Sequence, residues 1–123
     1  MVKSNRDLKV WEKAADLVVE SYGVTMVLSK SEMFGLSGQI RRATVSIPAN
    51  IAEGHGRNHL SDYLRHLSVV NGSLMEFETH FLVMTRLFYT TTDDVRKTLD
   101  LTGEVGGMLA GLTSKLKARL AAP

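Results

Sequence analysis

The amino-acid sequence predicts an all-α protein, folded as an up-down-up-down antiparallel four-helix bundle. Three observations lead to this fold class. Apolar residues recur every three or four positions in four segments, short polar or glycine-containing stretches separate these segments, and alternating strand patterns are almost absent. The 123 residues are enough for one domain with a real core and too few for two. We therefore expect one four-helix bundle domain over residues 1–123 with short connections.

Composition places the chain among ordinary globular proteins. Apolar residues make up 44% of the sequence and charged residues 23%, and cysteine is absent. The absence of cysteine rules out disulfides and thiolate metal sites and is typical of a reducing compartment. The first residues lack the apolar core of a secretion signal, and no apolar run approaches the roughly 20 residues that a membrane-spanning helix needs. We expect a cytoplasmic protein that does not interact with a membrane.

The first predicted helix covers about residues 8–28 and carries two apolar faces. One face consists of Trp11, Ala15, Val18 and Tyr22, and the other of Val10, Ala14, Leu17 and Val24. Both faces are expected to be buried. A turn follows, in which Ser31 is the predicted N-cap of the second helix.

The second predicted helix carries an apolar stripe beside a polar one. The apolar stripe consists of Leu36, Ile40, Ala43, Ile47 and Ile51. The polar stripe, about 100° further round the helix, consists of Gln39, Arg42, Ser46, Asn50 and Glu53. Such side chains form hydrogen bonds of defined geometry, so the polar stripe is expected to be an oligomer interface or a polar network. Glu53 lies four residues before Arg57, and we expect these two side chains to form a buried pair.

Proline and glycine mark the middle and the end of this second helix. Pro48 cannot donate a hydrogen bond to the Thr44 carbonyl, so the helix is expected to be kinked or interrupted there. Either Ser46 or Asn50 compensates for the break, or the kink directs Asn50 and other polar residues toward a partner. The helix is expected to end at a glycine, Gly54 or Gly56, in the left-handed conformation.

The third and fourth predicted helices supply most of the core. The third, about residues 61–88, has the buried face Leu67, Val70, Leu74, Phe77, Phe81, Met84 and Phe88. The fourth, about residues 93–120, places inward Val95, Leu99, Leu109, Leu112, Leu116 and Leu120. The fourth also contains glycines at 103, 106, 107 and 111, which destabilise a helix and therefore indicate close approach of another helix or a locally loose segment.

The motifs of bundle enzymes are missing. A di-iron centre needs Glu-x-x-His pairs, and the sequence contains none. His55 and His59 have a spacing that could suit a metal, but the nearby glycines are expected to end the helix between them. We therefore expect a protein that is not an enzyme, with no catalytic residue, no cofactor and no metal site.

Positive charge is unevenly distributed, although the net charge is only +2. After Glu104 the sequence contains no acid. The candidate nucleic-acid-binding residues are Arg41, Arg57, Arg65, Lys115, Lys117 and Arg119. Cations in the last turns of a helix also stabilise its dipole, which is the alternative explanation for the three at the C-terminal end.

Four segments carry a resemblance to a known family: residues 7–14, 34–43, 45–54 with Arg57, and 72–78. The chain resembles the four-helix-bundle proteins encoded in intervening sequences of bacterial large-subunit ribosomal RNA genes. It is similar also to the accessory variability protein of diversity-generating retroelements, which belongs to the same family. The Ser-Ile-Pro-x-Asn-Ile-Ala-Glu-Gly segment, residues 46–54, is the most specific part of the match.

The resemblance implies a homopentameric ring with a central opening. For retroelement members it also implies binding to a reverse transcriptase and to RNA or DNA through basic surfaces. Residues that match the family motif are Arg41, Arg42, Asn50, Glu53 and Arg57, and Arg65 matches a basic position common in the third helix.

Two classes of function follow. In the first, the protein is a nucleic-acid-associated adaptor that contacts phosphates. In the second, it is a structural scaffold that recruits another protein without binding nucleic acid.

Overall fold

The computed structural model describes residues 5–26, 28, 35–87, 89–90 and 92–123. In these residues the chain forms the helices α1 (Asn5–Thr25), α2 (Leu36–His55), α3 (Leu60–Arg86) and α4 (Thr92–Ala121). The predicted all-α class is confirmed, and each helix lies within a few residues of its predicted range. The predicted cap Ser31 and the predicted core residue Phe88 lie outside the described residues.

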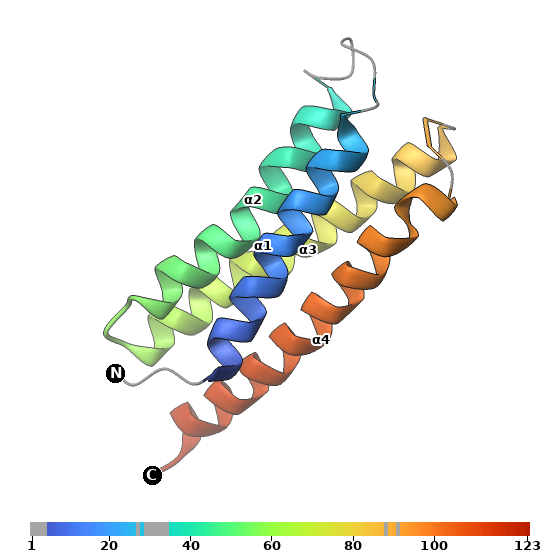
Figure 1. The fold of residues 1–123 in the computed structure, drawn as a ribbon. Helices are drawn as coiled ribbons and strands as arrows, with labels where there is room; N and C mark the ends of the chain where they lie inside the picture. Colours follow the sequence, from blue (N-terminus) through green and yellow to red (C-terminus); the bar gives the residue numbers. More distant parts are fainter. Residues whose placement is uncertain (1–4, 27, 29–34, 88, 91) are drawn as a thin grey trace.

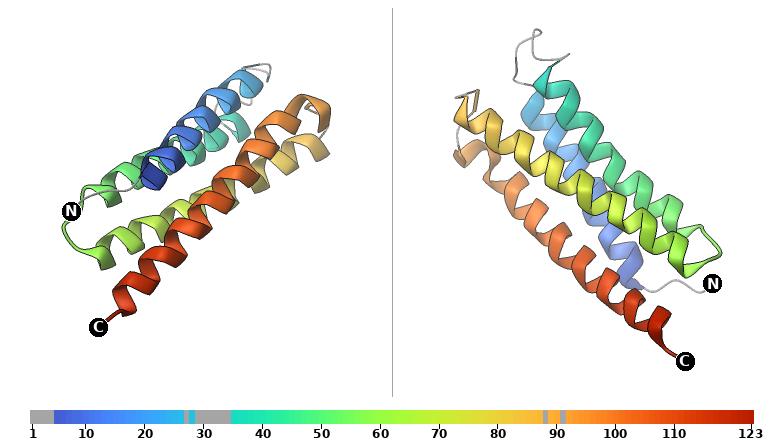
Figure 2. Two further views of the ribbon diagram at one scale, coloured as in Figure 1. Left: turned by 60° about the horizontal axis from the view of Figure 1, so that its bottom comes forward. Right: turned by 180° about the vertical axis from the view of Figure 1, so that it is seen from behind.

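The helices form an elongated antiparallel bundle (Figures 1 and 2). Each helix packs against the next one in the chain, and α4 closes the bundle against α1. The pair α2 and α3 shares the most extensive contact. The helix α1 begins, α2 ends, α3 begins and α4 ends at one end of the bundle, which we call the terminal end (Figure 1). Within the described residues, no helix combines the length and apolarity needed to cross a bilayer.

The core lies along the axis of the bundle and follows the predicted apolar stripes. Of the α2 stripe, all but Leu36 are buried, and Leu36 packs against the core from its edge. Every described member of the predicted α3 face is buried, and Phe77 stacks on Phe81 with ring centroids 4.6 Å apart. These long, periodic stripes therefore determine which side of each helix faces inward.

Two predictions about burial are wrong. Trp11 and Tyr22 are 41% and 37% exposed, so the α1 face that contains these two residues is not buried as predicted. The reason is that α1 packs mainly against α2 and α4, which leaves one of its sides in solvent. Leu120 is 53% exposed because it lies in the last turn of α4. The core instead includes Val105, which the sequence analysis did not select.

The glycines at the end of α2 have a different role from the predicted one. Gly56 follows the last helical residue with φ −80° and ψ −3°, so the prediction of a left-handed terminating glycine is wrong there. Gly54 is a buried residue inside the helix. A Cβ at Gly54 would lie 2.7 Å from His66 Cβ and 3.0 Å from Tyr63 Cδ1. Gly54 therefore allows the end of α2 to pack closely against the start of α3.

Pro48 lies inside α2, and the helix continues on both sides of it from Leu36 to His55. An interruption of the helix is therefore not observed, whereas a kink stays a prediction. The Asn50 side chain donates to the Ser46 carbonyl oxygen at 2.9 Å, one turn earlier. Asn50 is thus held within the chain close to the proline.

The glycines of α4 also differ from expectation. No atom of another helix lies within 4 Å of a Cβ built on Gly103, Gly107 or Gly111. Only Gly106 faces a neighbour, with Leu74 Cδ2 at 3.5 Å from the added Cβ. Close approach of another helix within the chain is therefore wrong for three of these four glycines. They form an exposed strip of bare backbone along α4.

Candidate functional site

The centre of the polar stripe forms a hydrogen-bond network between α2 and α3. Ser46 Oγ lies 3.0 Å from Ser73 Oγ, and the Asn50 amide group donates to Ser46 Oγ at 3.0 Å. Asn50 Oδ1 lies 3.2 Å from His66 Nδ1. Four side chains thus connect the two helices at the interface that is most extensive in the bundle.

The direction of these bonds assigns the tautomer of His66. The Asn50 nitrogen is already a donor to Ser46, so Asn50 Oδ1 must accept and His66 Nδ1 must carry the proton. In neutral His66 the Nε2 atom is then an acceptor, and it is buried without a hydrogen-bond partner among the described residues.

The remaining members of the polar stripe are exposed. Gln39, Arg42 and Glu53 all point to solvent. Glu53 Oε1 lies 2.9 Å from Arg57 Nη2, so the predicted pair forms, but both side chains are exposed and the prediction of a buried pair is wrong. The stripe is therefore a polar network at its centre and an open surface at its ends, and its role as an oligomer interface stays a prediction.

Arg41 is separated from the other candidate nucleic-acid-binding residues. It lies in the second turn of α2, at the opposite end of the bundle from Arg57. Its guanidinium lies 4.5 Å from the ring centroid of Tyr22, and its Nε donates to Thr25 Oγ1 at 3.0 Å. Arg41 therefore fastens α1 to α2, with part of its charge already satisfied by a cation–π contact.

The other five candidates gather at the terminal end. Arg57 lies in the connection between α2 and α3, Arg65 in the second turn of α3, and Lys115, Lys117 and Arg119 in the last turns of α4. All five side chains are exposed. Arg57 pairs with Glu53, and Arg65 lies 3.8 Å from Asp62. The bundle topology thus collects on one end the cations that are spread over 63 positions of sequence, from 57 to 119.

A buried cluster at the same end was missed by the sequence analysis. Tyr63 of α3 donates its hydroxyl to Asp7 Oδ2 of α1 at 2.8 Å, and both side chains are buried. His55 Nε2 lies 3.9 Å from the same oxygen, and its ring meets the Tyr63 ring edge-on at 6.1 Å. The available signals, an acid in the first turn of α1 and a tyrosine at a core position of α3, lie 56 residues apart. Nothing in a local pattern connects them.

Burial raises the pKa of the Tyr63 hydroxyl above its ordinary value of 10.0. The hydrogen bond to Asp7 and the negative charge of Asp7 act in the same direction, because both disfavour a phenolate. Tyr63 is therefore a hydrogen-bond donor that holds a buried carboxylate, and it fixes the start of α1 to α3. In the described residues, no three histidine, aspartate or glutamate side chains come together as a metal site would require.

The comparisons with known proteins agree with this architecture. The sequence matches the family of 23S rRNA-intervening sequence proteins over residues 6–111. The fold matches a crystal structure from Bacteroides thetaiotaomicron, described as a protein of unknown function from the S23 ribosomal protein family, with a TM-score of 0.82. The two sequences are 23% identical, and the match covers 89% of this chain and 98% of the other. No curated protein matches the sequence. The match over most of its length shows that this chain belongs to the 23S rRNA-intervening sequence protein family.

Proposed function

We propose that this protein is a non-enzymatic adaptor that assembles into a homopentameric ring and binds RNA or DNA through the terminal end of its bundle. A reverse transcriptase is the protein partner that the family resemblance suggests. The observation that carries the nucleic-acid role is the collection of five exposed cations on that end, contributed by three separate segments of the chain. Lys and Arg side chains at a surface neutralise phosphates and release counterions, which drives binding without sequence preference.

The charges on α4 are the best suited to phosphate contact. Within the described residues, Lys115, Lys117 and Arg119 have no acidic partner. Arg57 is paired with Glu53, and Arg65 lies near Asp62. To bind a phosphate, Arg57 and Arg65 would have to give up these carboxylate partners. We therefore expect the last turns of α4 to contribute most of the affinity.

Salt dependence tests the nucleic-acid role. Short labelled RNA and DNA oligonucleotides are titrated with the protein over a range of salt concentrations, and binding is followed by fluorescence anisotropy. The affinity should fall with salt, with a logarithmic slope of about 0.7 per neutralised phosphate on single strands and about 0.9 on duplex DNA. Absence of binding at low salt would remove this function.

A pair of variants on one helix localises the contact. The double substitution Lys115→Ala with Arg119→Ala should weaken binding. It should also reduce the slope of log affinity against log salt concentration by the amount expected for about two phosphate contacts. The matched control is Arg96→Ala with Lys97→Ala, which removes two exposed cations from the opposite end of α4. Equal losses in both double variants would contradict binding through the terminal end.

The alternative is a scaffold that recruits another protein without nucleic acid. The observation in its favour is the number of large apolar side chains exposed on α2 and α3, which include Val45, Val69, Met75, Leu82 and Val83. Exposed apolar side chains of this size are common at protein interfaces when they form a contiguous patch. A protein that assembles normally, shows no affinity for either oligonucleotide and is captured by a reverse transcriptase would support the scaffold.

A further inference from the structure

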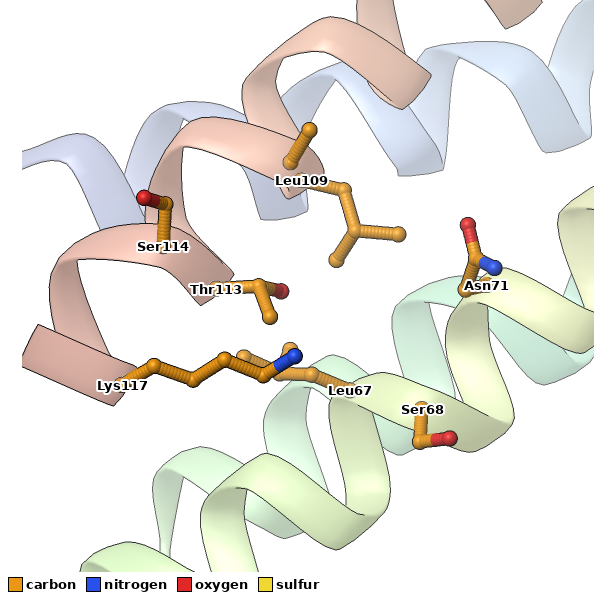
Figure 3. Close-up of a pocket in the computed structure, with 8 residues that line it drawn as sticks. Leu67, Ser68, Asn71, Leu109, Thr113, Ser114 and Lys117 are labelled. Atoms are coloured by element: carbon orange, nitrogen blue, oxygen red, sulfur yellow. The ribbon is translucent and has the colours of Figure 1, made fainter. Parts of the chain in front are cut away.

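A cavity of about 500 Å³ lies between α3 and α4. Its lining residues are Leu67, Ser68 and Asn71 of α3 and Leu109, Ala110, Thr113, Ser114 and Lys117 of α4. Figure 3 shows Leu109, Thr113 and Lys117 extending from α4 toward α3. Cavities that bind small molecules have volumes of about 300–1,000 Å³, so this one is large enough for an organic ligand.

The cavity exists because α4 carries short side chains where it faces this part of α3. Ala110, Thr113 and Ser114 occupy positions at which a longer side chain would fill the space between the helices. Leu67 and Leu109 are 1% and 2% exposed and close the cavity toward the core. The floor is therefore apolar, and it is made by residues that the core already holds in place.

The walls of the cavity are polar and carry one positive charge. Ser68, Thr113 and Ser114 supply hydroxyl groups and Asn71 supplies an amide. Lys117 reaches from α4 toward α3 (Figure 3). None of the described residues that line the cavity is acidic. Five side chains that can donate hydrogen bonds thus surround an apolar floor with no competing carboxylate.

We propose that this cavity binds a small organic anion with an apolar body, a carboxylate or a phosphate monoester. The ammonium group of Lys117 pairs with the anionic group, and the hydroxyl and amide groups donate further hydrogen bonds to its oxygens. The apolar body covers Leu67 and Leu109. A single ammonium group beside a partly open pocket suits a small ligand, whereas a nucleic-acid backbone requires a series of cations along an extended surface. This binding site shares Lys117 with the cations proposed for phosphate contact, and its other lining residues are separate from them.

Three probes with the same apolar chain test the proposal: octanoate, octyl phosphate and uncharged octanol. Each is titrated into the isotope-labelled protein up to about 10 mM, a range that covers weak dissociation constants. Octanoate or octyl phosphate should produce saturable shifts in the backbone amide signals of Ser68, Asn71 and Thr113. The stronger of the two identifies the anionic group that the site prefers. Octanol should bind at least about tenfold more weakly, because it cannot pair with an ammonium group.

A matched pair of lysine variants tests the role of charge. Lys117→Met removes the ammonium group while keeping an apolar stem, and it should weaken octanoate binding about tenfold with no effect on octanol. Lys115→Met is the control, because Lys115 is exposed on the same helix and does not line the cavity. Its affinity for octanoate should equal that of the unmodified protein.

Filling the cavity tests its location. Thr113→Leu and Ala110→Leu each place a larger side chain in the space, and both should abolish the saturable shifts. Ala110 is exposed and leucine suits a helix, so Ala110→Leu should fold even where Thr113→Leu does not. The proposal is overturned if neither anion gives saturable shifts at these residues, if octanol binds as well as octanoate, or if a folded Ala110→Leu protein still binds octanoate.

Discussion

At the scale of single residues, the hydrogen bond from Tyr63 to Asp7 is expected to contribute strongly to stability. It is buried, one partner is a carboxylate, and it joins the first turn of α1 to α3. Tyr63→Phe removes one buried hydrogen bond to the Asp7 carboxylate, which typically costs about 1–3 kcal/mol in the free energy of unfolding. Urea unfolding at neutral pH measures the loss. Tyr22→Phe is the control, since Tyr22 is partly exposed and its ring contact with Arg41 is retained.

The raised pKa of Tyr63 leads to a prediction of how stability depends on pH in the alkaline range. In the folded protein the pKa of Tyr63 is raised, whereas in the unfolded chain it has its ordinary value near 10.0. Above pH 10 the unfolded state therefore binds fewer protons than the folded state, and the free energy of unfolding falls as pH rises, by up to about 1.4 kcal/mol per pH unit for this group. Below pH 10 the contribution is fully present.

The difference in unfolding free energy between the unmodified protein and Tyr63→Phe should thus narrow as pH rises above 10. Comparing the two proteins cancels the titration of lysines, which they share. If the difference in unfolding free energy between the unmodified protein and Tyr63→Phe does not change with pH, the titration of the Tyr63 hydroxyl does not cause the loss of stability at high pH.

Within the polar stripe, burial determines which substitution is harmful. Asn50→Ala removes the partner of His66 Nδ1 and two bonds to Ser46, so we expect a loss of about 1–3 kcal/mol. Glu53→Ala breaks only an exposed pair, worth about 0–1 kcal/mol, and should resemble Glu12→Ala. Urea midpoints of the three variants decide this order. A Glu53→Ala midpoint as low as that of Asn50→Ala would indicate that Glu53 is buried by another molecule.

At the scale of the helices, the contact of α2 with α3 depends on Gly54. In Gly54→Ala the new Cβ would lie 2.7 Å from His66 Cβ, which is attached directly to the backbone and cannot move without it. Overpacking of this kind costs about 1–3 kcal/mol. Gly107→Ala is the control: nothing lies within 4 Å of its Cβ, and alanine should raise the free energy of unfolding by about 0.5–1 kcal/mol. Thermal unfolding of both variants gives the two opposite shifts, and a stabilised Gly54→Ala would contradict the observed contact.

The helices themselves could be predicted from sequence, because apolar periodicity reports directly on the side of a helix that is buried. The prediction of the α2 and α3 stripes is confirmed for every described residue except Leu36, which is only partly buried. Prediction failed where burial depends on neighbours that a local pattern does not specify. The α1 face around Trp11 has the correct spacing but no helix beside it, and Gly54 resembles a helix end although it is a packing position.

The candidate site shows the same division. The polar stripe and its spacing were evident in the sequence, yet only the structure divides it into an inner network and exposed ends. The Asp7 and Tyr63 pair and the α3–α4 cavity could not be predicted, since both join residues that lie far apart in the sequence, on different helices. Hydrogen-bond partners and cavities depend on the register of one helix against another, which periodicity alone leaves open.

At the scale of the whole molecule, the surface is divided between its ends and its sides. The terminal end carries five exposed cations, whereas the exposed sides of α2 and α3 carry apolar residues and the outer members of the polar stripe. A protein in which these two regions are separate can bind its own copies along the side and a different partner at the end. Assembly and nucleic-acid binding should therefore be separable by mutation.

The first prediction at this scale is self-assembly through the exposed sides of α2 and α3. Light scattering at micromolar concentration should give a mass of about five times the 13.6 kDa of one chain, as the family resemblance implies. Arg42→Glu reverses an exposed charge in the polar stripe, and it should lower the mass toward that of a monomer while circular dichroism stays unchanged. Glu12→Lys is the matched control, an exposed charge reversal on α1 that should leave the mass unaltered. A monomeric unmodified protein would refute the ring, and a fully assembled Arg42→Glu would place the interface away from this stripe.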